Sequence, residues 1–267
     1  MIRAIVCGAA GRMGGRIIAL MKEAGDFELA GAVERPDHPA LGRDAGEVAG
    51  IGKAGVAITA DLAKVAREGQ VGFDFTAPEA AIANIGRAAE AGLAMVVGTT
   101  GMKADALAWA RELSRRIPLL IAPNMSVGVN VTYTLLAQAA AKLGDEYDVE
   151  VFEIHHRFKV DAPSGTAAKM AQVIAGARGQ DLDQVGTYGR KGIVGERKPH
   201  EIAVHALRGG DIAGEHTVVF AGMGERIEIT HRAHSRDNFG RGALRAARWI
   251  VGKPAGLYDM GDVLGLK

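Results

Sequence analysis

The sequence predicts a doubly wound α/β fold, in which helices cover both faces of a parallel sheet, and a second α+β domain with an open mixed sheet. In the first half of the chain, short β-rich runs alternate with helical stretches, as they do in parallel sheets. These runs carry apolar residues on both faces, which is typical of strands buried on both sides. Farther along, three alternating strands follow one another without helices between them, and this indicates a second sheet.

The first half contains six expected strands and four expected helices. Runs of β-branched and other apolar residues bounded by turns favour strands, and they occur at residues 2–7, 29–33, 56–59, 71–75, 94–97 and 119–122. Helical stretches between them are expected at residues 13–24, at 61–68, from Pro78 onward and at 103–116. We therefore expect the first domain to span residues 1–126.

The second half has a different order of elements. We expect helices at residues 127–143 and 165–177, a strand at 149–155 before the second of them, and a polar loop at 178–199. Strands should follow at 201–207, 216–221 and 226–231, the last two joined as a hairpin by residues 222–224. An open sheet leaves one face exposed, for which another subunit is the expected cover. This second domain is expected at residues 127–235.

A last helical pattern occupies residues 237–251. It places Phe239, Leu244, Ala247 and Ile250 near one stripe, as in a helix that packs against a core. We expect residues 236–267 to return to the first domain.

Charge and cysteine content exclude several classes of protein. With 32 basic and 31 acidic residues the formal net charge is +1, so no global field draws the chain to nucleic acid or anionic lipid. A bound anion must therefore be held by a local site. A single cysteine, Cys7, excludes an intramolecular disulfide and suits a reducing compartment. The first residues show no charged leader followed by a long apolar core, so we expect a cytoplasmic location.

The longest stretch without a charged residue, 117–141, is too polar and too often interrupted to span a membrane. It contains Pro118, Pro123, Asn124, Ser126, Asn130, Thr132, Thr134 and Gln138. We therefore expect no membrane partner.

Three glycines, Gly8, Gly11 and Gly14, directly follow the first expected strand and open the first expected helix. Glycine permits a tight turn there and lets the backbone approach a pyrophosphate, whose charge is met by N–H groups of the helix N-terminus. The spacing G-x-x-G-x-x-G differs from the usual G-x-G-x-x-G, and such a string alone is more often a plain turn. Its position between strand and helix favours a Rossmann-like dinucleotide site.

Glu34 ends the second expected strand, 20 residues after Gly14. An acidic side chain at this point accepts hydrogen bonds from an adenosine ribose, and a solvated strand end is the alternative. Arg35 beside it can pair with a 2′-phosphate, so NADH and NADPH both remain open. The run GTTG at residues 98–101 follows the fifth expected strand on the same edge, either as part of the site or as a simple turn.

Residues 155–166, HHRFKVDAPSGT, combine several groups that suit acid–base chemistry. His155 and His156 point to opposite faces if the strand continues through both, so at most one is expected to enter a given pocket. Lys159 follows closely and can add positive charge or deliver a proton. A lone histidine is more often structural, and the neighbours are what favour a catalytic role.

The same run ends in a helix start. Ser164 is expected to cap the helix, and Gly165 and Thr166 then offer backbone N–H groups in its first turn. A helix N-terminus with a hydroxyl and nearby cations binds a carboxylate or phosphate. The alternative is an ordinary capped helix, against which the nearby Lys159 argues.

Other candidate sites are weaker. His231 and His234 have a spacing seen in metal sites, but no cysteine accompanies them, so we expect no metal. The remaining histidines of this half are scattered, at His200, His205 and His216. Ser164 lacks a G-x-S-x-G context, which argues against a hydrolase. A basic loop without aromatic residues is expected to be solvated or interfacial, and not a nucleic-acid site, at Arg190, Lys191, Arg197 and Lys198.

Several motifs occur in order along nearly the whole chain. They are GAAGRMG (8–14), Glu34-Arg35, GTTG (98–101), APNMSVGVN (122–130), HHRFKVDAPSGTA (155–167), RGGDIAGEHTV (208–218) and HRAHSRDNF (231–239). Together they resemble the dihydrodipicolinate reductase family, the 4-hydroxy-tetrahydrodipicolinate reductases of diaminopimelate and lysine biosynthesis. The resemblance implies an oxidoreductase with an N-terminal nucleotide domain, completed by the C-terminal helix, and a central substrate domain that builds a homotetramer.

The resemblance also implies roles at matching positions. Contacts with NADH or NADPH are implied for Gly8, Ala9, Ala10, Gly11, Arg12, Met13, Glu34, Arg35, Gly98, Thr99, Thr100, Ala122, Pro123, Asn124 and Met125. Met125 stands where the family often has an aromatic residue, a departure that bears on nicotinamide packing and not on backbone contacts. His155 and Lys159 are implied as the proton-handling pair, and His156, Gly165 and Thr166 as contacts of the substrate carboxylates.

The implied reaction is reduction of a cyclic imine dicarboxylate. Hydride reaches ring C4, negative charge moves through the conjugated C=N bond, and a proton must be supplied. Whether Lys159 or His155 supplies that proton stays open. Two other functions also stay open: a nucleotide-sensing protein without turnover, and a reductase of another small dicarboxylate on the same scaffold.

Overall fold

The computed structural model describes residues 1–267, which divide into two compact units. The first comprises Met1–Val127 together with Asp237–Lys267, and the second comprises Gly128–Arg236. Each unit has its own sheet and its own apolar core. No helix is both long enough and apolar enough to cross a membrane.

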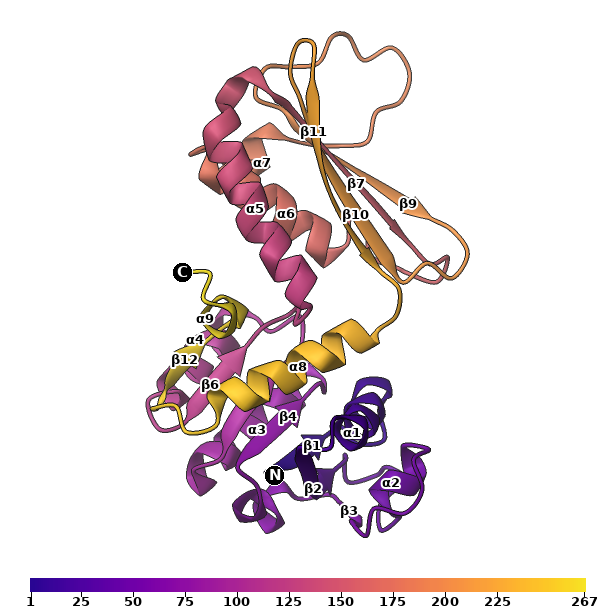
Figure 1. Cartoon of the computed structure of the whole chain (residues 1–267), viewed down its shortest axis with the longest axis vertical. Coiled ribbons are helices and arrows are strands. Elements are labelled where there is room, and N and C mark those ends of the chain that lie inside the picture. Colours follow the sequence, from indigo (N-terminus) through magenta and orange to yellow (C-terminus); the bar gives the residue numbers. More distant parts are fainter. The chain divides into compact units, whose positions relative to one another are not determined.

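A seven-stranded sheet forms the centre of the first unit (Figure 1), and all of its strand pairs are parallel. In spatial order its strands are β12 (Gly256–Tyr258), β6 (Pro118–Ile121), β5 (Ala94–Val97), β4 (Val71–Asp74), β1 (Ile2–Cys7), β2 (Phe27–Val33) and β3 (Ile58–Thr59). The chain order reverses between β1 and β4, and loops at the carboxyl ends of strands around such a reversal form ligand sites. The expected doubly wound parallel sheet is confirmed.

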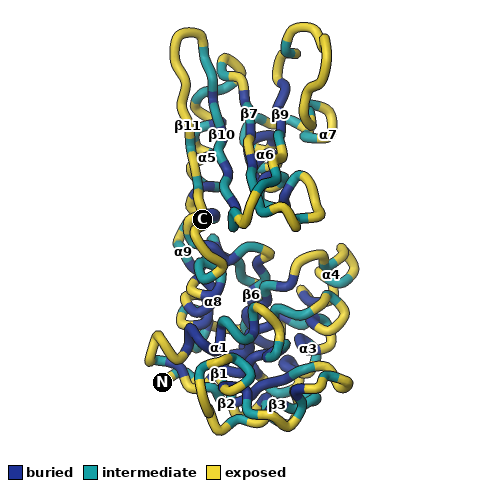
Figure 2. Tube along the Cα trace, turned by 90° about the vertical axis from the view of Figure 1, so that its right-hand side faces the viewer, coloured by how far each residue is buried: buried dark blue, intermediate teal, exposed yellow.

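Helices cover both faces of this sheet. They are α1 (Arg12–Ala24), α2 (Ala45–Val48), α3 (Pro78–Ala91), α4 (Ala104–Leu113), α8 (Asp237–Ile250) and α9 (Met260–Leu264). On one face Val6 packs with residues of α1 and α8 in one core, and on the other Ile5 packs with residues of α3 and α4 in a second. In Figure 2 buried residues, in dark blue, gather in the middle of this unit. Alternate strand residues thus enter opposite cores, which explains why the strands carry apolar residues on both faces.

Close backbone contact fixes α8 within the first unit. A Cβ on Gly242 would lie 1.8 Å from the carbonyl oxygen of Met125, and one on Gly240 would lie 2.4 Å from Cδ1 of Leu20. Glycine in a helix interior costs about 1 kcal/mol relative to alanine, and here it permits the close packing. The guanidinium of Arg16 in α1 also donates to both carboxylate oxygens of Asp237, at 2.6 and 2.7 Å.

The second unit contains a five-stranded mixed sheet (Figure 1). In spatial order its strands are β11 (Arg226–Ala233), β10 (Gly214–Ala221), β7 (Asp148–His155), β9 (Ile202–Arg208) and β8 (Gly186–Tyr188). The pairs β7–β9 and β8–β9 are parallel, whereas β7–β10 and β10–β11 are antiparallel. The helices of this unit are α5 (Val127–Leu143), α6 (Gly165–Ala177) and α7 (Leu182–Val185). The expected α+β domain with an open mixed sheet is confirmed.

The two faces of this sheet differ. Residues of α5 and α6 pack on one face against apolar side chains of β7, β9 and β10, including Val151 and Phe220. On the other face the side chains of Phe152 and Leu207 are 41% and 46% exposed. The ring of Phe152 stacks on His205 of the neighbouring strand, with centroids 5.2 Å apart. An apolar face of this kind invites association.

Several short elements differ from the expectations. The segment at 178–199, expected to be a polar loop, contains α7 and β8. Residues 61–68, expected to be one helix, form two 3₁₀ turns that are separated at Val65, whose φ of −120° is not helical. The strand β12 and the helices α2 and α9 were not expected either. Elements of three to five residues depend on pairing with distant strands and on caps, which local hydrophobic periodicity does not report.

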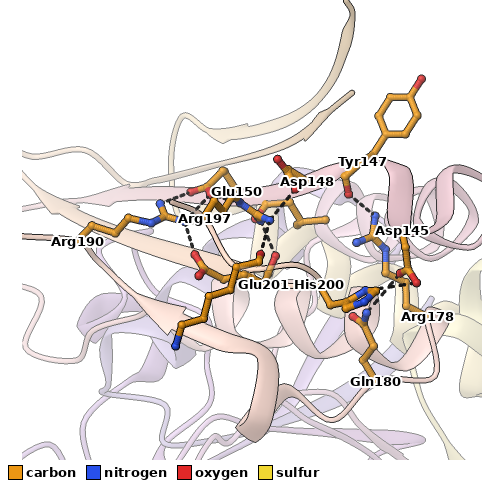
Figure 3. A network of polar contacts seen from close by, with 12 residues as sticks. Asp145, Tyr147, Asp148, Glu150, Arg178, Gln180, Arg190, Arg197, His200 and Glu201 are labelled. Carbon is orange, nitrogen blue, oxygen red and sulfur yellow. Dashed lines mark hydrogen bonds and ion pairs between the residues drawn. The ribbon is translucent and has the colours of Figure 1, made fainter. Parts of the chain in front are cut away.

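Ion pairs anchor the segment between β8 and β9 to the sheet (Figure 3). The guanidinium of Arg190 bonds Glu150 at 2.8 Å and also contacts Glu201, and that of Arg197 bonds Asp148 at 2.7 Å and Glu150 at 3.2 Å. The basic loop expected to be solvated or interfacial therefore has two arginines in internal ion pairs, while Lys191 and Lys198 are exposed.

Candidate active site

The turn after β1 brings the glycine string against the end of β2. Gly8, with a φ of 74°, and Ala9 donate from their N–H groups to the carbonyl of Val33 at 2.8 and 3.0 Å. Gly11 then precedes the first residue of α1 as its N-cap. A positive φ suits glycine, so the sequence forms the tight strand-to-helix turn that a phosphate-binding loop requires.

Two adjacent glycines of this turn differ in how closely they are packed. A Cβ on Gly14 would lie 2.1 Å from the carbonyl oxygen of Gly8, a distance that real Cβ atoms do not show. A Cβ on Gly15 would meet nothing closer than 3.8 Å. Gly14 is therefore required for the shape of the turn, and Gly15 is not.

Glu34 and Arg35 lie where β2 meets this turn. The carboxylate of Glu34 accepts from the N–H groups of Ala10 at 3.1 Å and Arg35 at 3.0 Å. The guanidinium of Arg35 bonds Asp37 at 3.1 Å and is 63% exposed. An acidic and a basic side chain thus both lie beside the turn, where they can meet a ribose hydroxyl or a phosphate.

Asp74, which the sequence analysis did not single out, connects the loops that follow β4 and β5 with helix α3. Its buried carboxylate accepts from the Thr76 N–H at 3.0 Å, the Thr76 hydroxyl at 2.7 Å, the Asn84 amide at 2.8 Å and the Thr99 hydroxyl at 3.1 Å. The side chain of Thr76 also reaches the turn after β1, because its Cγ2 lies 3.0 Å from where a Gly8 Cβ would be. An aspartate that ends a buried strand, two residues before a threonine, was the available signal.

The GTTG run and the segment after β6 complete this edge. The ring of Phe75 packs so closely on Gly98 that a Cβ would lie 2.1 Å from it, and Thr99 is buried. Ala122 donates to the carbonyl of Val97 at 3.0 Å, and the side chain of Met125 is 1% exposed, within the core. All residues expected to contact a dinucleotide therefore lie in the first unit, in the loops that follow β1, β2, β5 and β6 or at the start of α1.

The remaining expected site residues lie in the second unit, where β7 ends and α6 begins. Ser164 caps α6, accepting from the Ala167 N–H at 3.1 Å, so that Gly165 and Thr166 occupy the first turn. The N–H groups of a first turn have no intrahelical acceptors and favour anions. Tyr133 of α5 hydrogen-bonds the side chain of Thr166, and burial raises the pKa of Tyr133 to about 12.

Glu153, which the sequence analysis also did not single out, is a buried carboxylate at the centre of this site. One oxygen accepts from His155 Nδ1 at 2.6 Å and Arg208 at 2.8 Å, and the other accepts from Arg208 at 3.0 Å and the Ser164 N–H at 2.9 Å. Its side chain is fully buried. Burial opposes the charge, but the bonds to Arg208, His155 and Ser164 hold the pKa of Glu153 below its ordinary value.

Two histidine rings adjoin Glu153 on the core face. His155 contacts His216 edge to face, with centroids 5.1 Å apart, and Nε2 of His216 lies 3.0 Å from the Ser164 hydroxyl. Burial lowers the pKa of His155, and it lowers that of His216 to about 3, so His216 is neutral at ordinary pH. The register pairs His216 with Glu153 on one side and His231 on the other, which places all three on one face.

Lys159 and His156 lie beyond the end of β7. The ammonium of Lys159 bonds both oxygens of Asp161 at 2.8 and 2.9 Å, and this contact lowers the pKa of Asp161. The Arg208 guanidinium donates to the Asp161 carbonyl at 2.6 Å, which links this loop to Glu153. His156 follows the last strand residue, and its Nδ1 is buried without a hydrogen-bond partner.

The structure thus brings His155, Lys159 and the α6 start together through side chains that sequence reasoning missed. Arg208 and His216 belong to the RGGDIAGEHTV segment, which the sequence analysis used only for its resemblance. His216 was read as one of several scattered histidines. No group of three or more His, Cys, Asp or Glu side chains has a geometry that could hold a metal ion.

Comparisons with known proteins cover the whole chain. The family model "Dihydrodipicolinate reductase, N-terminus" matches residues 2–125, and the model "Dihydrodipicolinate reductase, C-terminus" matches residues 128–264. A 4-hydroxy-tetrahydrodipicolinate reductase of Geobacter sp. (strain M21) is 56% identical over 267 residues, and one of Syntrophus aciditrophicus (strain SB) is 55% identical. Both alignments span all of this chain and all of the relative.

Solved structures agree on the fold. A dipicolinate-bound dihydrodipicolinate reductase of Paenisporosarcina sp. TG-14 is similar with a TM-score of 0.76 over 97% of each chain, at 23% identity. An amine dehydrogenase of Mycobacterium smegmatis has a TM-score of 0.60 over 96% of this chain and 94% of its own, at 14% identity. Because sequence similarity extends over both halves and far exceeds that of the structural neighbours, the resemblance is confirmed, and the chain belongs to the dihydrodipicolinate reductase family.

Proposed function

We propose that this chain is the enzyme that reduces 4-hydroxy-tetrahydrodipicolinate to tetrahydrodipicolinate in diaminopimelate and lysine biosynthesis, with NADH or NADPH as reductant and with release of the 4-hydroxyl group as water. The observation that carries the proposal is identity of more than half the residues, over full length, with reductases of that name. The site supports it chemically, because an acid–base histidine, a lysine and an anion-binding helix start meet in one unit.

The first unit fits a dinucleotide. The backbone of the turn at Gly8–Met13 packs so closely on Gly14 that a Cβ there has no room. Gly98 is equally confined, by the ring of Phe75. Residues 98–100 and 122–125 would complete the contacts, with Met125 contributing backbone because its side chain is buried. Glu34 suits ribose hydroxyls and Arg35 suits a 2′-phosphate, so both nicotinamide cofactors fit. When bound, the cofactor supplies the hydride.

Replacing Gly14 with alanine is expected to weaken cofactor binding about 10- to 100-fold, because relieving the 2.1 Å contact with Gly8 moves the turn at a cost of about 1–3 kcal/mol. Titration of NADPH fluorescence measures the dissociation constant. Gly15→Ala is the matched control, since its Cβ meets nothing closer than 3.8 Å. Equal affinities of the two variants would show that the shape of the turn does not govern binding.

The second unit supplies the groups that a dicarboxylate requires. Gly165 and Thr166 in the first turn of α6, together with His156, would bind the substrate carboxylates. Lys159 is already paired with Asp161, so a substrate carboxylate would compete with that aspartate for the ammonium. As negative charge develops on the ring system, Lys159 or His155 supplies the proton.

The exposed face of the second sheet supports a proposed homotetramer. Phe152 and Leu207 are exposed there, and another copy of the chain would cover them. A reducing, cytoplasmic location fits the biosynthetic reaction and the single buried cysteine, Cys7. Light scattering on the purified protein measures the number of subunits.

The decisive experiment mixes the protein with reduced cofactor and substrate freshly made by the preceding enzyme, and follows nicotinamide absorbance. Turnover that requires both supports the proposal. Cofactor binding without turnover would identify a nucleotide-sensing protein instead. Faster turnover of a different imine or keto dicarboxylate would identify a related reductase.

A further inference from the structure

We infer that Glu153 is a positioning residue that orients the proton-handling His155 and, through the same carboxylate, the start of α6. The inference rests on the proposed function, because it concerns the groups that would handle the proton and bind the substrate carboxylates. It assigns a role to a side chain that makes no expected contact with substrate or cofactor.

Four hydrogen bonds occupy both carboxylate oxygens of Glu153. Each carboxylate oxygen accepts two bonds, from His155 Nδ1 at 2.6 Å and Arg208 at 2.8 Å, and from Arg208 at 3.0 Å and the Ser164 N–H at 2.9 Å. Its side chain is fully buried. A buried charge without these partners would be unstable, so all three groups hold one another in place.

This arrangement determines the tautomer of His155. An ionised carboxylate only accepts hydrogen bonds, so Nδ1 must carry a proton, and Nε2 is the atom that takes up or releases the reaction proton. Gly214 makes room for that side of the ring, because a Cβ there would lie 2.8 Å from Nε2. The edge of the His216 ring restricts the imidazole from another side, at 5.1 Å between centroids.

The charges around His155 act in opposite directions. Burial lowers its pKa, and the positive charges of Lys159 and Arg208 lower it further, whereas the bond and the charge of Glu153 raise it. His216, on the neighbouring strand, is neutral at ordinary pH. Removing the charge of Glu153 should therefore move the ionisation of His155 to lower pH, and removing the charge of Arg208 should move it to higher pH.

The test uses Glu153→Gln and Arg208→Gln, with two readouts. The pH profile of turnover shows the limb that belongs to His155, and proton NMR of the imidazole, assigned by its absence from His155→Gln, follows the same ionisation without turnover. We expect Glu153→Gln to shift both by about one pH unit downward. Arg208→Gln should shift both in the opposite direction.

Glu150→Gln is the matched control (Figure 3). Glu150 lies on the same strand three residues earlier, on the opposite face, and bonds Arg190 at 2.8 Å, Arg197 at 3.2 Å and His205 at 2.7 Å. The Glu150→Gln variant loses a comparable set of ion pairs. A shift of the His155 ionisation caused only by general loss of structure would therefore appear in this variant too. We expect its melting temperature to fall and the ionisation of His155 to stay in place.

Shifts of opposite sign in the two site variants, with none in the control, support the inference. An unmoved ionisation of His155 in Glu153→Gln overturns it, as does an equal shift in Glu150→Gln. If Glu153→Gln fails to fold, Glu153→Asp decides: its shorter side chain withdraws the carboxylate from Nδ1, so the ionisation of His155 should move to lower pH, and an unmoved ionisation overturns the inference. Absence of turnover in the unaltered protein would contradict the proposed function alone, because the NMR titration tests Glu153 independently.

Discussion

Lys159→Ala is expected to lower turnover by about 10²- to 10⁴-fold, the range for loss of a general acid or base. The ammonium is held by Asp161 at 2.8 and 2.9 Å, with the side chain of Lys159 only 19% exposed. Alanine removes the cation that we propose offsets the negative charge developing on the substrate ring. It also leaves the Asp161 carboxylate unpaired, so an anionic substrate is repelled and its KM rises as kcat falls.

Asp161→Asn separates these two effects. It keeps the ammonium of Lys159 and removes the competing negative charge, so we expect kcat to stay within a few-fold of the unaltered value while the substrate KM falls. Steady-state kinetics at saturating cofactor measure both constants. Turnover of Lys159→Ala equal to that of the unaltered enzyme would remove Lys159 from the mechanism.

His155→Ala is the second change with a large expected effect, again about 10²- to 10⁴-fold in turnover. The imidazole is the group that Glu153 orients, at 2.6 Å, and its side chain is 11% exposed. Alanine deletes the proposed proton carrier but leaves Glu153 bonded to Arg208 and the Ser164 N–H, so the start of α6 is retained. The substrate KM should therefore change much less than kcat.

His205→Ala is its control. His205 also pairs with a glutamate, Glu150 at 2.7 Å, but on the opposite face of the same sheet. We expect His205→Ala to retain nearly normal turnover, whereas His155→Ala loses it. If both histidine variants retained full turnover, proton transfer would have to be assigned to Lys159 alone.

The sequence predicted most of the fold because its long elements are determined locally. The bounds expected for residues 165–177 coincide with α6, since Ser164 caps that helix and the apolar spacing continues to Ala177. The strands of the first unit were predicted because burial on both sides of the sheet gives them apolar residues on both faces. Short elements such as β12 were missed because their existence depends on pairing with a distant strand, here β6.

The candidate site divides in the same way. His155, Lys159 and the glycine turn stand within motifs whose spacing suggests chemistry. Glu153 and Asp74 do not, because an acidic residue within or at the end of a strand is usually solvated, and burial of each depends in part on donors far along the chain. Arg208 is 55 residues from Glu153, and Thr99 is 25 residues from Asp74. Such partners become visible only when strand order and register are known.

The discontinuity of the first unit has a consequence for the newly synthesised protein. The second unit, Gly128–Arg236, is contiguous, whereas the first still lacks α8 and the edge strand β12 when that segment leaves the ribosome. Until Asp237–Ile250 emerges, the apolar face that receives Leu244 and Ala247 stays open to water and to chaperones. The half translated first is therefore completed last.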